Sequence, residues 1–301
     1  MPRIWTLFSA FLQKYAAKIR IFCGKYSCLA FFLYLCATMN EQNKISVVIN
    51  TRNAEEHLAQ VLEAVKDFDE VVVCDMESTD RTLDIARQYG CKIVTFPKAD
   101  HKSAEPARTF AIQSADYSWV LVVDADEIVT PELRDYLYRR IAEPDCPAGL
   151  YIPRLNRFMG RYTKSLSYDH QLRFFRREGT VWPPYVHTFP KVEGRTEKIP
   201  ASLRHVRFIH LADETIGDLV RKTNAYTDGE QQKRGEKNYG LGALIGRPVW
   251  RFFRNYILKM GFRDGLPGLV HAGMDAFYQF VLVAKIIEKR TRNDKSSRKN
   301  G

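Results

Sequence analysis

Two carboxylates separated by one residue close an apolar run near the middle of the chain. The segment WVLVVDADE, residues 119–127, ends in Asp124 and Asp126, and Glu127 follows directly. A short, continuous apolar run of this kind is typical of a strand buried in a parallel sheet. Ligands of open α/β sheets bind at the carboxyl ends of the strands, so carboxylates placed there can face a cation or a sugar hydroxyl. The alternative is a solvated turn, because Asp is common in turns.

The chain upstream alternates predicted strands with predicted helices. Its apolar runs predict three further strands, at residues 45–50, 70–75 and 91–96. After the first of them, apolar residues recur at helical spacing at Leu58, Val61, Leu62 and Val65. After the second, the polar residues 78–80 suit the start of a helix and Gly90 suits its end. Such alternation predicts an α/β fold with a mostly parallel central sheet.

Three of these segments together resemble the nucleotide-sugar-binding half of a known enzyme family. They are ISVVINTRNAEEHLAQVLEAV, VVVCDMESTDRTLDIA and WVLVVDADE, and their order and spacing agree with the family over roughly residues 44–142. The chain thus resembles the family 2 inverting glycosyltransferases with the GT-A fold, and more narrowly the bacterial lipopolysaccharide-core β-glucosyltransferases. The resemblance implies transfer of a sugar, with inversion, from a nucleoside-diphosphate sugar, UDP-sugar favoured, to a cell-envelope glycan or glycolipid acceptor.

The resemblance also implies roles for individual residues. It places four of them in the first two strand-end loops beside the nucleotide: Thr51, Asn53, Glu55 and Asp75. Asp75 would accept a hydrogen bond from a uracil-type ring, and Asp124 would approach the ribose. Asp126 would hold a divalent cation, Mg²⁺ or Mn²⁺, against the diphosphate, whose charge requires a hard cation. Arg108 would contact the diphosphate, with a solvated helix charge as the alternative.

An inverting transfer needs one general base to deprotonate the acceptor hydroxyl. The segment SYDHQLRFFRR, residues 167–177, resembles the family's acidic residue followed by Gln-x-Arg-Leu-Phe, which implies that Asp169 is the base. His187 matches a family histidine near the acceptor and is the second catalytic candidate. The family usually has Glu after it, but Thr188 stands here. His210 is expected to help shape the same region.

The C-terminal third predicts contact with a membrane surface. Arg247, Arg251 and Arg254 share one helical face of residues 247–260, while apolar side chains occupy another. Residues 266–288 predict a mostly apolar helix with one polar stripe, which consists of His271, Asp275 and Gln279. These features predict peripheral attachment to anionic lipid at the cytoplasmic face of the bacterial inner membrane, and packing against the catalytic domain is the alternative.

The domain organisation expected from the sequence has four parts. Residues 1–38 form a basic and apolar extension, either outside the native protein, with translation starting at Met39, or a membrane-touching helix. Residues 39–246 form the glycosyltransferase domain, residues 247–288 the membrane-associating helices, and residues 289–301 a basic, disordered tail.

Composition excludes some classes of function and leaves others open. The net charge of +11 lies largely in the two ends, which favours a membrane over nucleic acid as the partner. The six cysteines include no C-x-x-C pair, so neither a zinc site nor a disulfide framework is indicated. A nucleotidyltransferase is disfavoured because the loop after the first strand has no glycine. A catalytically silent scaffold in an envelope-assembly complex also remains open.

Overall fold

The computed structural model describes residues 43–101, 104–163, 169–184, 188–200, 202–213, 215–234 and 239–299. The strands are β1 (Ile45–Thr51), β2 (Glu70–Asp75), β3 (Lys92–Thr95), β4 (Trp119–Asp124), β5 (Glu127–Val129), β6 (Gly149–Phe158), β7 (Arg161–Tyr162), β8 (Asp169–Arg176), β9 (Thr196–Lys198) and β10 (Phe208–Asp213). The helices are α3 (Leu58–Val65), α4 (Thr82–Gln88), α5 (Glu105–Gln113), α6 (Pro131–Ile141), α7 (Ile216–Arg234), α8 (Leu241–Phe253), η2 (Arg254–Leu258), η3 (Gly261–Asp264) and α9 (Leu266–Lys299).

The four N-terminal strands form the parallel sheet that the sequence predicts. They lie in the order β3-β2-β1-β4, and all three pairings are parallel. β1 is buried along its whole length, which explains its uninterrupted apolar sequence. The four residues with predicted helical spacing form the buried face of α3. Gly90 closes α4 with a φ of 68°, a left-handed conformation that glycine adopts without strain.

The other half of the sheet makes it mixed. β8 is antiparallel both to β4 and to β6, while β10 is parallel to β6 and antiparallel to β5. This arrangement brings the middle of the chain back beside β4, the strand that ends in Asp124. The registers pair Leu121 with Phe174 and Arg154 with Asp169.

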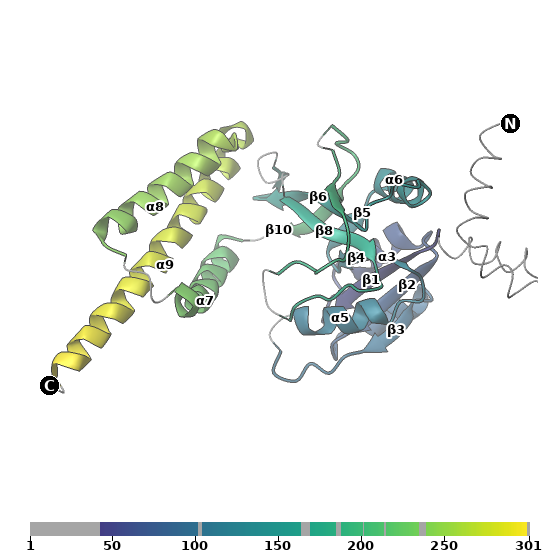
Figure 1. Cartoon of the computed structure of the whole chain (residues 1–301), viewed down its shortest axis with the longest axis horizontal. Helices are drawn as coiled ribbons and strands as arrows, with labels where there is room; N and C mark the ends of the chain where they lie inside the picture. The colour runs from purple at the N-terminus through teal and green to yellow at the C-terminus, as the bar shows by residue number, and fades with distance from the viewer. Residues whose placement is uncertain are drawn as a thin grey trace, which may run out of the picture.

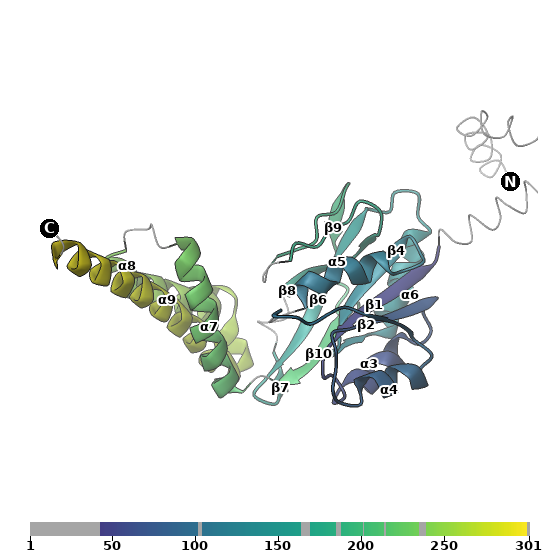
Figure 2. The same cartoon turned by 90° about the horizontal axis from the view of Figure 1, so that it is seen from below.

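Helices cover both faces of this sheet (Figures 1 and 2). One hydrophobic cluster joins α3 and α6 to side chains such as Ile49 and Leu121, and the other joins α5 to Val48 and Val122. Successive residues of β1 therefore contribute to opposite layers, as expected for a strand buried on both sides. The two layers fix the ends of β1 and β4 side by side.

The helices α7, α8 and α9 form a group apart from the sheet, at the opposite end of the molecule from β2 and β3 (Figure 1). The sheet ends at Asp213, and α7 packs on α9, so the helical group begins before the boundary expected at residue 246. α9 continues to Lys299, where a disordered tail was expected from residue 289. Residues 1–38 and His187 lie outside the described residues.

Candidate active site

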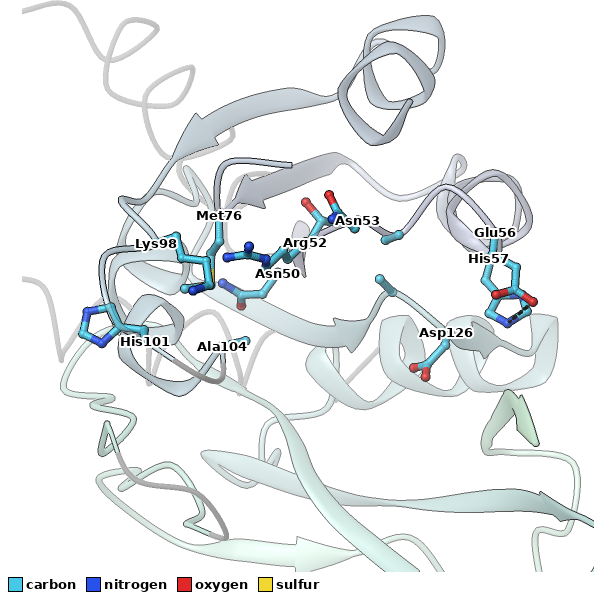
Figure 3. Close-up of a pocket in the computed structure, with 13 residues that line it drawn as sticks. Asn50, Arg52, Asn53, Glu56, His57, Met76, Lys98, His101, Ala104 and Asp126 are labelled. Carbon is cyan, nitrogen blue, oxygen red and sulfur yellow. Dashed lines mark ion pairs between the residues drawn. The ribbon is translucent and has the colours of Figure 1, made fainter. Parts of the chain in front are cut away.

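A cleft of about 670 Å³ opens where β1 and β4 end (Figure 3). Residues from the first strand-end loop, the loop after β2, the loop before α5 and the end of β4 line it: Asn50, Thr51, Arg52, Asn53, Ala54, Glu56, His57, Met76, Lys98, His101, Ala104, Ala125 and Asp126. Of the predicted site residues, the cleft thus collects Thr51, Asn53 and Asp126. The crevice lies at the carboxyl ends of the parallel strands, as the sheet geometry predicts.

The residues predicted beside the nucleotide also hold the loops of the cleft together. Asp75 is buried and accepts hydrogen bonds from Thr51 Oγ1 at 3.0 Å and from Ser78 N at 2.8 Å. Asn53 has a φ of 49°, and its Oδ1 accepts a hydrogen bond from Thr79 N at 2.8 Å. Glu55 accepts from Arg81 N and lies outside the cleft lining. These contacts join the loops after β1 and β2 into one wall.

Asn50 is the side chain in the cleft that most clearly lacks partners. It is 9% exposed, and neither its side-chain oxygen nor its nitrogen has a hydrogen-bond partner among the described residues. Buried amides are nearly always paired, because leaving one unpaired costs about 1–3 kcal/mol. Asn50 lines the cleft, so a ligand with both a donor and an acceptor would satisfy it.

Asp124 lies beneath two arginines rather than in the cleft lining. Arg173 donates to both of its oxygens, at 3.0 and 2.5 Å, and Arg108 Nη2 donates to Oδ1 at 2.8 Å. Both guanidinium groups also lie over the ring of Trp182, at 4.5 Å for Arg108 and 5.5 Å for Arg173. Burial raises the pKa of Asp124, but Arg173 and Arg108 outweigh it and hold the pKa far below its usual range. The two arginines therefore stabilise the ionised form of Asp124, while Nε and Nη1 of Arg108 have no hydrogen-bond partner among the described residues.

A second set of ion pairs leads from Asp124 to the predicted base. Glu127 is fully buried, accepts from the Asp124 backbone N–H at 3.1 Å and pairs with Arg154 at 3.1 Å. Burial and the charge of Asp124 raise the pKa of Glu127. Arg154 also donates to Asp169 at 2.7 Å, and Gln171 Nε2 donates to the other Asp169 oxygen at 2.7 Å. The Asp169 side chain is 38% exposed, so it is held in place yet open to solvent.

Asp126 has a histidine as its partner. His210 Nε2 lies 3.2 Å from Asp126 Oδ2, and the Asp126 carbonyl accepts from Leu211 N at 2.8 Å, so β10 fixes this loop. Oxygen and nitrogen ligands at about 2.1 Å on neighbouring positions of an octahedral cation lie about 3 Å apart, so this pair fits one cation. Among the residues that the structure describes, no cluster of three or more His, Cys, Asp or Glu side chains is arranged for a metal. Any cation here would need ligand oxygens from a substrate or water.

Sequence reasoning identified Arg108 but missed two other arginines of the site, Arg173 and Arg154. Arg173 stands inside the Gln-x-Arg-Leu-Phe element used to find Asp169, so its place in the motif was a usable signal. Arg154 carries no local motif and is recognisable only through its register opposite Asp169. The residue after Arg108 also has a structural role, because Thr109 Oγ1 donates to the Trp182 carbonyl at 2.9 Å.

Comparison with known proteins agrees with this architecture. Residues 46–192 match the family model for glycosyl transferase family 2. The glycosyltransferase RT0209 of Rickettsia typhi is 28% identical over 81% of this chain and 87% of its own. The lipopolysaccharide core biosynthesis glycosyltransferase LpsC of Rhizobium meliloti is 26% identical over 81% of this chain and 92% of its own.

Among solved structures, that of S. aureus TarS 1-349 in complex with UDP aligns with 82% of this chain and 92% of its own, at 16% identity and a TM-score of 0.46. The residues matched by the family model include those that line the cleft, Asp124, and the strand β8 that begins at Asp169. The mixed sheet with its strand-end cleft is a GT-A-like fold. Residues 46–192 thus form a glycosyl transferase family 2 domain, and the chain belongs among the glycosyltransferases.

Proposed function

We propose that this glycosyltransferase moves a sugar from a nucleoside-diphosphate sugar, with UDP-sugar favoured, to a cell-envelope glycan or a lipid-linked acceptor such as lipopolysaccharide core. The observation that carries the proposal is the Asp126–His210 pair at the mouth of a cleft that also contains the unpartnered amide of Asn50. The similarity to LpsC supports the envelope acceptor. Hexose transfer with inversion is part of the proposal.

The charges in the cleft suit a diphosphate. Arg52 and Lys98 line it, and within the described part of the chain neither is paired with a carboxylate. Asp126 and His210 would hold a divalent cation, which supplies positive charge to the leaving diphosphate. Because an imidazole nitrogen is a softer ligand than a carboxylate, this donor set favours Mn²⁺ over Mg²⁺. Asn50, with an amide that both donates and accepts, suits the edge of a base or the hydroxyls of a ribose.

Asp169 is the general base in this proposal. Its carboxylate is fixed by Arg154 and Gln171 from the strand side and is partly exposed on the other. It would take the proton from the acceptor hydroxyl while that oxygen attacks the anomeric carbon from the face opposite the diphosphate. No covalent intermediate is needed. His187 stays a second candidate that falls outside the described residues.

We propose that the acceptor is met at the cytoplasmic face of the bacterial inner membrane, with residues 247–288 in contact with an anionic lipid surface. A peripheral position there would leave the cleft open to a cytoplasmic nucleotide sugar. The apolar helix α9 and the similarity to LpsC support this location. Nucleic acid is not expected as a partner.

A thermal-shift screen with UDP, dTDP, GDP and ADP, each with and without Mn²⁺, tests donor binding. A ligand at about 100 times its Kd adds roughly 2.7 kcal/mol of stability, and we expect the largest rise with UDP and Mn²⁺ together. Equal shifts with all four nucleotides, unaffected by Mn²⁺, would contradict the proposal.

Product analysis separates the remaining classes of function. A glycosyltransferase slowly hydrolyses UDP-sugar to UDP and free sugar when no acceptor is present. A nucleotidyltransferase would instead release pyrophosphate from a nucleoside triphosphate and a sugar phosphate. A catalytically silent scaffold would do neither, so UDP release above a protein-free control decides in favour of the proposed activity.

A further inference from the structure

The helix α8 exposes its apolar face to the outside of the molecule. Leu241, Ile245, Val249 and Phe253 follow one another at intervals of four residues, and their exposed fractions are 71%, 58%, 62% and 44%. Trp250 stands beside this row with 59% of its surface exposed. A helix of a water-soluble domain normally turns such a row inward, because burying apolar surface is the main source of stability.

Polar side chains join α8 and the following η2 to α9. Arg247 Nη2 donates to Gln279 Oε1 at 3.2 Å, and Asn255 Nδ2 donates to Asp275 Oδ2. Arg247 also lies over the Tyr239 ring at 5.2 Å. Two residues of the polar stripe of α9, Asp275 and Gln279, therefore face η2 and α8. We call residues 241–280 the inverted hairpin, since polar side chains meet between its helices while most of its large apolar side chains are exposed.

The same inversion continues through the turn and into α9. The exposed apolar side chains there are Ile257, Leu258, Met260, Phe262, Leu266, Leu269, Phe277 and Phe280. Three exposed cationic side chains lie among the apolar side chains of the turn between α8 and α9: Arg254, Lys259 and Arg263. A contiguous apolar surface rimmed by cations fits a bilayer with anionic headgroups, where Lys and Arg reach the phosphates while apolar side chains enter the acyl layer.

The lengths of the two helices argue against a full crossing. α8 has 13 residues, fewer than the roughly 20 that span the hydrocarbon core. By length and composition, the segment Leu266–Arg292 of α9 could cross a membrane, and only 28% of its most apolar window is buried. However, from Tyr278 onward polar α7 packs against it, and Lys285 pairs with Asp228 at 2.7 Å. The free apolar part of α9, from Leu266 to Phe277, is thus about 12 residues long, or about 18 Å.

We propose that the inverted hairpin is a monotopic insertion device, whose outward apolar row enters one leaflet of an anionic membrane while Arg254, Lys259 and Arg263 bind the headgroups. This differs from attachment through a basic helical face, because Arg247 faces α9 rather than lipid. Apolar insertion, which salt does not screen, supplies most of the binding.

The insertion also has a direct connection to the site. The ring of His271, at the start of α9, meets Phe158 of β6 edge to face at 5.6 Å. Four residues earlier on the same strand, about 13 Å along it, Arg154 holds Asp169. The hairpin would therefore hold the base of the proposed reaction near the membrane that carries the acceptor. This last step rests on the proposed function, whereas the insertion itself does not.

Trp250 provides a depth probe for the insertion. In the full chain with Trp5→Phe, three tryptophans remain, of which Trp119 and Trp182 are buried. After reconstitution into vesicles of phosphatidylcholine and phosphatidylglycerol, lipids brominated in the acyl chain should quench the fluorescence of Trp250. Adding Trp250→Phe should abolish the quenching. Vesicle binding without acyl-chain quenching of Trp250 would overturn the proposal.

Point variants test which surface binds. Ile245→Asn with Val249→Asn should lower vesicle binding at least tenfold, both at 0.15 M and at 1 M NaCl. Val181→Asn is the matched control, because Val181 is 53% exposed on the sheet domain, and it should leave binding unchanged. Circular dichroism melting of each variant in detergent checks that it is folded. If the double variant is folded and binds like wild type, insertion through α8 is refuted.

Two further readouts separate the remaining explanations. Sedimentation of the wild type without vesicles tests whether a second copy of the chain covers the apolar row. The proposal would be overturned if the wild type is a dimer, the double variant is a monomer, and Trp250 is not quenched in vesicles. UDP binding in detergent should be the same in wild type and double variant. Its absence from both would contradict the proposed donor while leaving the insertion result valid.

Discussion

The sheet domain buries valines, isoleucines and leucines between its layers and carries its charges to the strand ends. The inverted hairpin instead buries Asn255 and Gln279 and exposes most of its large apolar side chains. Both regions have amphipathic elements, and they differ in which face they turn outward. The difference is what the proposed arrangement predicts, in which water surrounds the sheet domain and lipid contacts the hairpin. Charge should therefore dominate function in the first region and contribute little in the second.

The largest effect is expected where a charge at a strand end does chemistry. Asp169→Asn should lower turnover by roughly 10²–10⁴, the usual contribution of a general base, and should leave UDP affinity unchanged. Steady-state kinetics with UDP-sugar and acceptor, combined with UDP titration, measure the two effects separately. Asp213→Asn is a control, because Asp213 is a carboxylate at the end of β10 that pairs with Arg157. Turnover of Asp169→Asn within a few-fold of wild type would move the base elsewhere, with His187 next.

The second effect concerns the buried ion pairs beneath the cleft. Asp124→Asn leaves Arg108 and Arg173 without their anion, and removing one partner from a buried pair costs about 3–5 kcal/mol. Arg134→Met breaks the surface pair with Asp67 and should cost at most about 1 kcal/mol. Urea unfolding of both variants measures the two free energies. Equal losses would show that the buried network carries no special stability.

Sequence periodicity was sufficient for the parallel half of the sheet and for Asp126 at its edge, because strand and helix repeats are local properties. The pairing of Asp124 with two arginines was not predictable in this way. Arg108 and Arg173 are separated by 65 positions, and only the antiparallel insertion of β8 beside β4 brings them together.

Periodicity also identified two faces on residues 247–260 and a polar stripe on α9. It could not say which face would point outward, since a repeat of 3.6 residues is the same in water and in lipid. The contact between Arg247 and Gln279 supplies that answer.

A third, smaller effect appears in the pH dependence of stability. Asp124 has a lowered pKa, so its contribution is present above about pH 3.9 and is lost as the pH falls through its folded pKa. Glu127 has a raised pKa, so its contribution is present below about pH 4.3 and is lost as the pH rises through its folded value. The stability of wild type relative to Glu127→Gln should therefore fall with rising pH. Unfolding curves from pH 4 to pH 8 test the sign, and a rising difference would contradict the assignment.

The smallest effect is expected from a charge on the hairpin. Arg254→Gln should weaken binding to anionic vesicles about fivefold at 0.15 M NaCl, since a cation near such a surface contributes about 1 kcal/mol. At 1 M NaCl the variant and wild type should bind alike, because salt screens this contribution. Co-sedimentation at the two salt concentrations measures it. A larger loss that persists at high salt would mean that charge, rather than apolar insertion, governs the hairpin.

The central claim is that the cleft at the ends of β1 and β4 binds a nucleoside diphosphate through a cation at Asp126. Calorimetric titration of UDP with Mn²⁺ into wild type, Asp126→Asn and Glu56→Gln tests it most directly, since Glu56 is another carboxylate of the same cleft. Wild type and Glu56→Gln should bind UDP in a Mn²⁺-dependent manner, and Asp126→Asn should lose the Mn²⁺-dependent part while melting at an unchanged temperature. The same Mn²⁺-dependent affinity in Asp126→Asn as in wild type would contradict the claim.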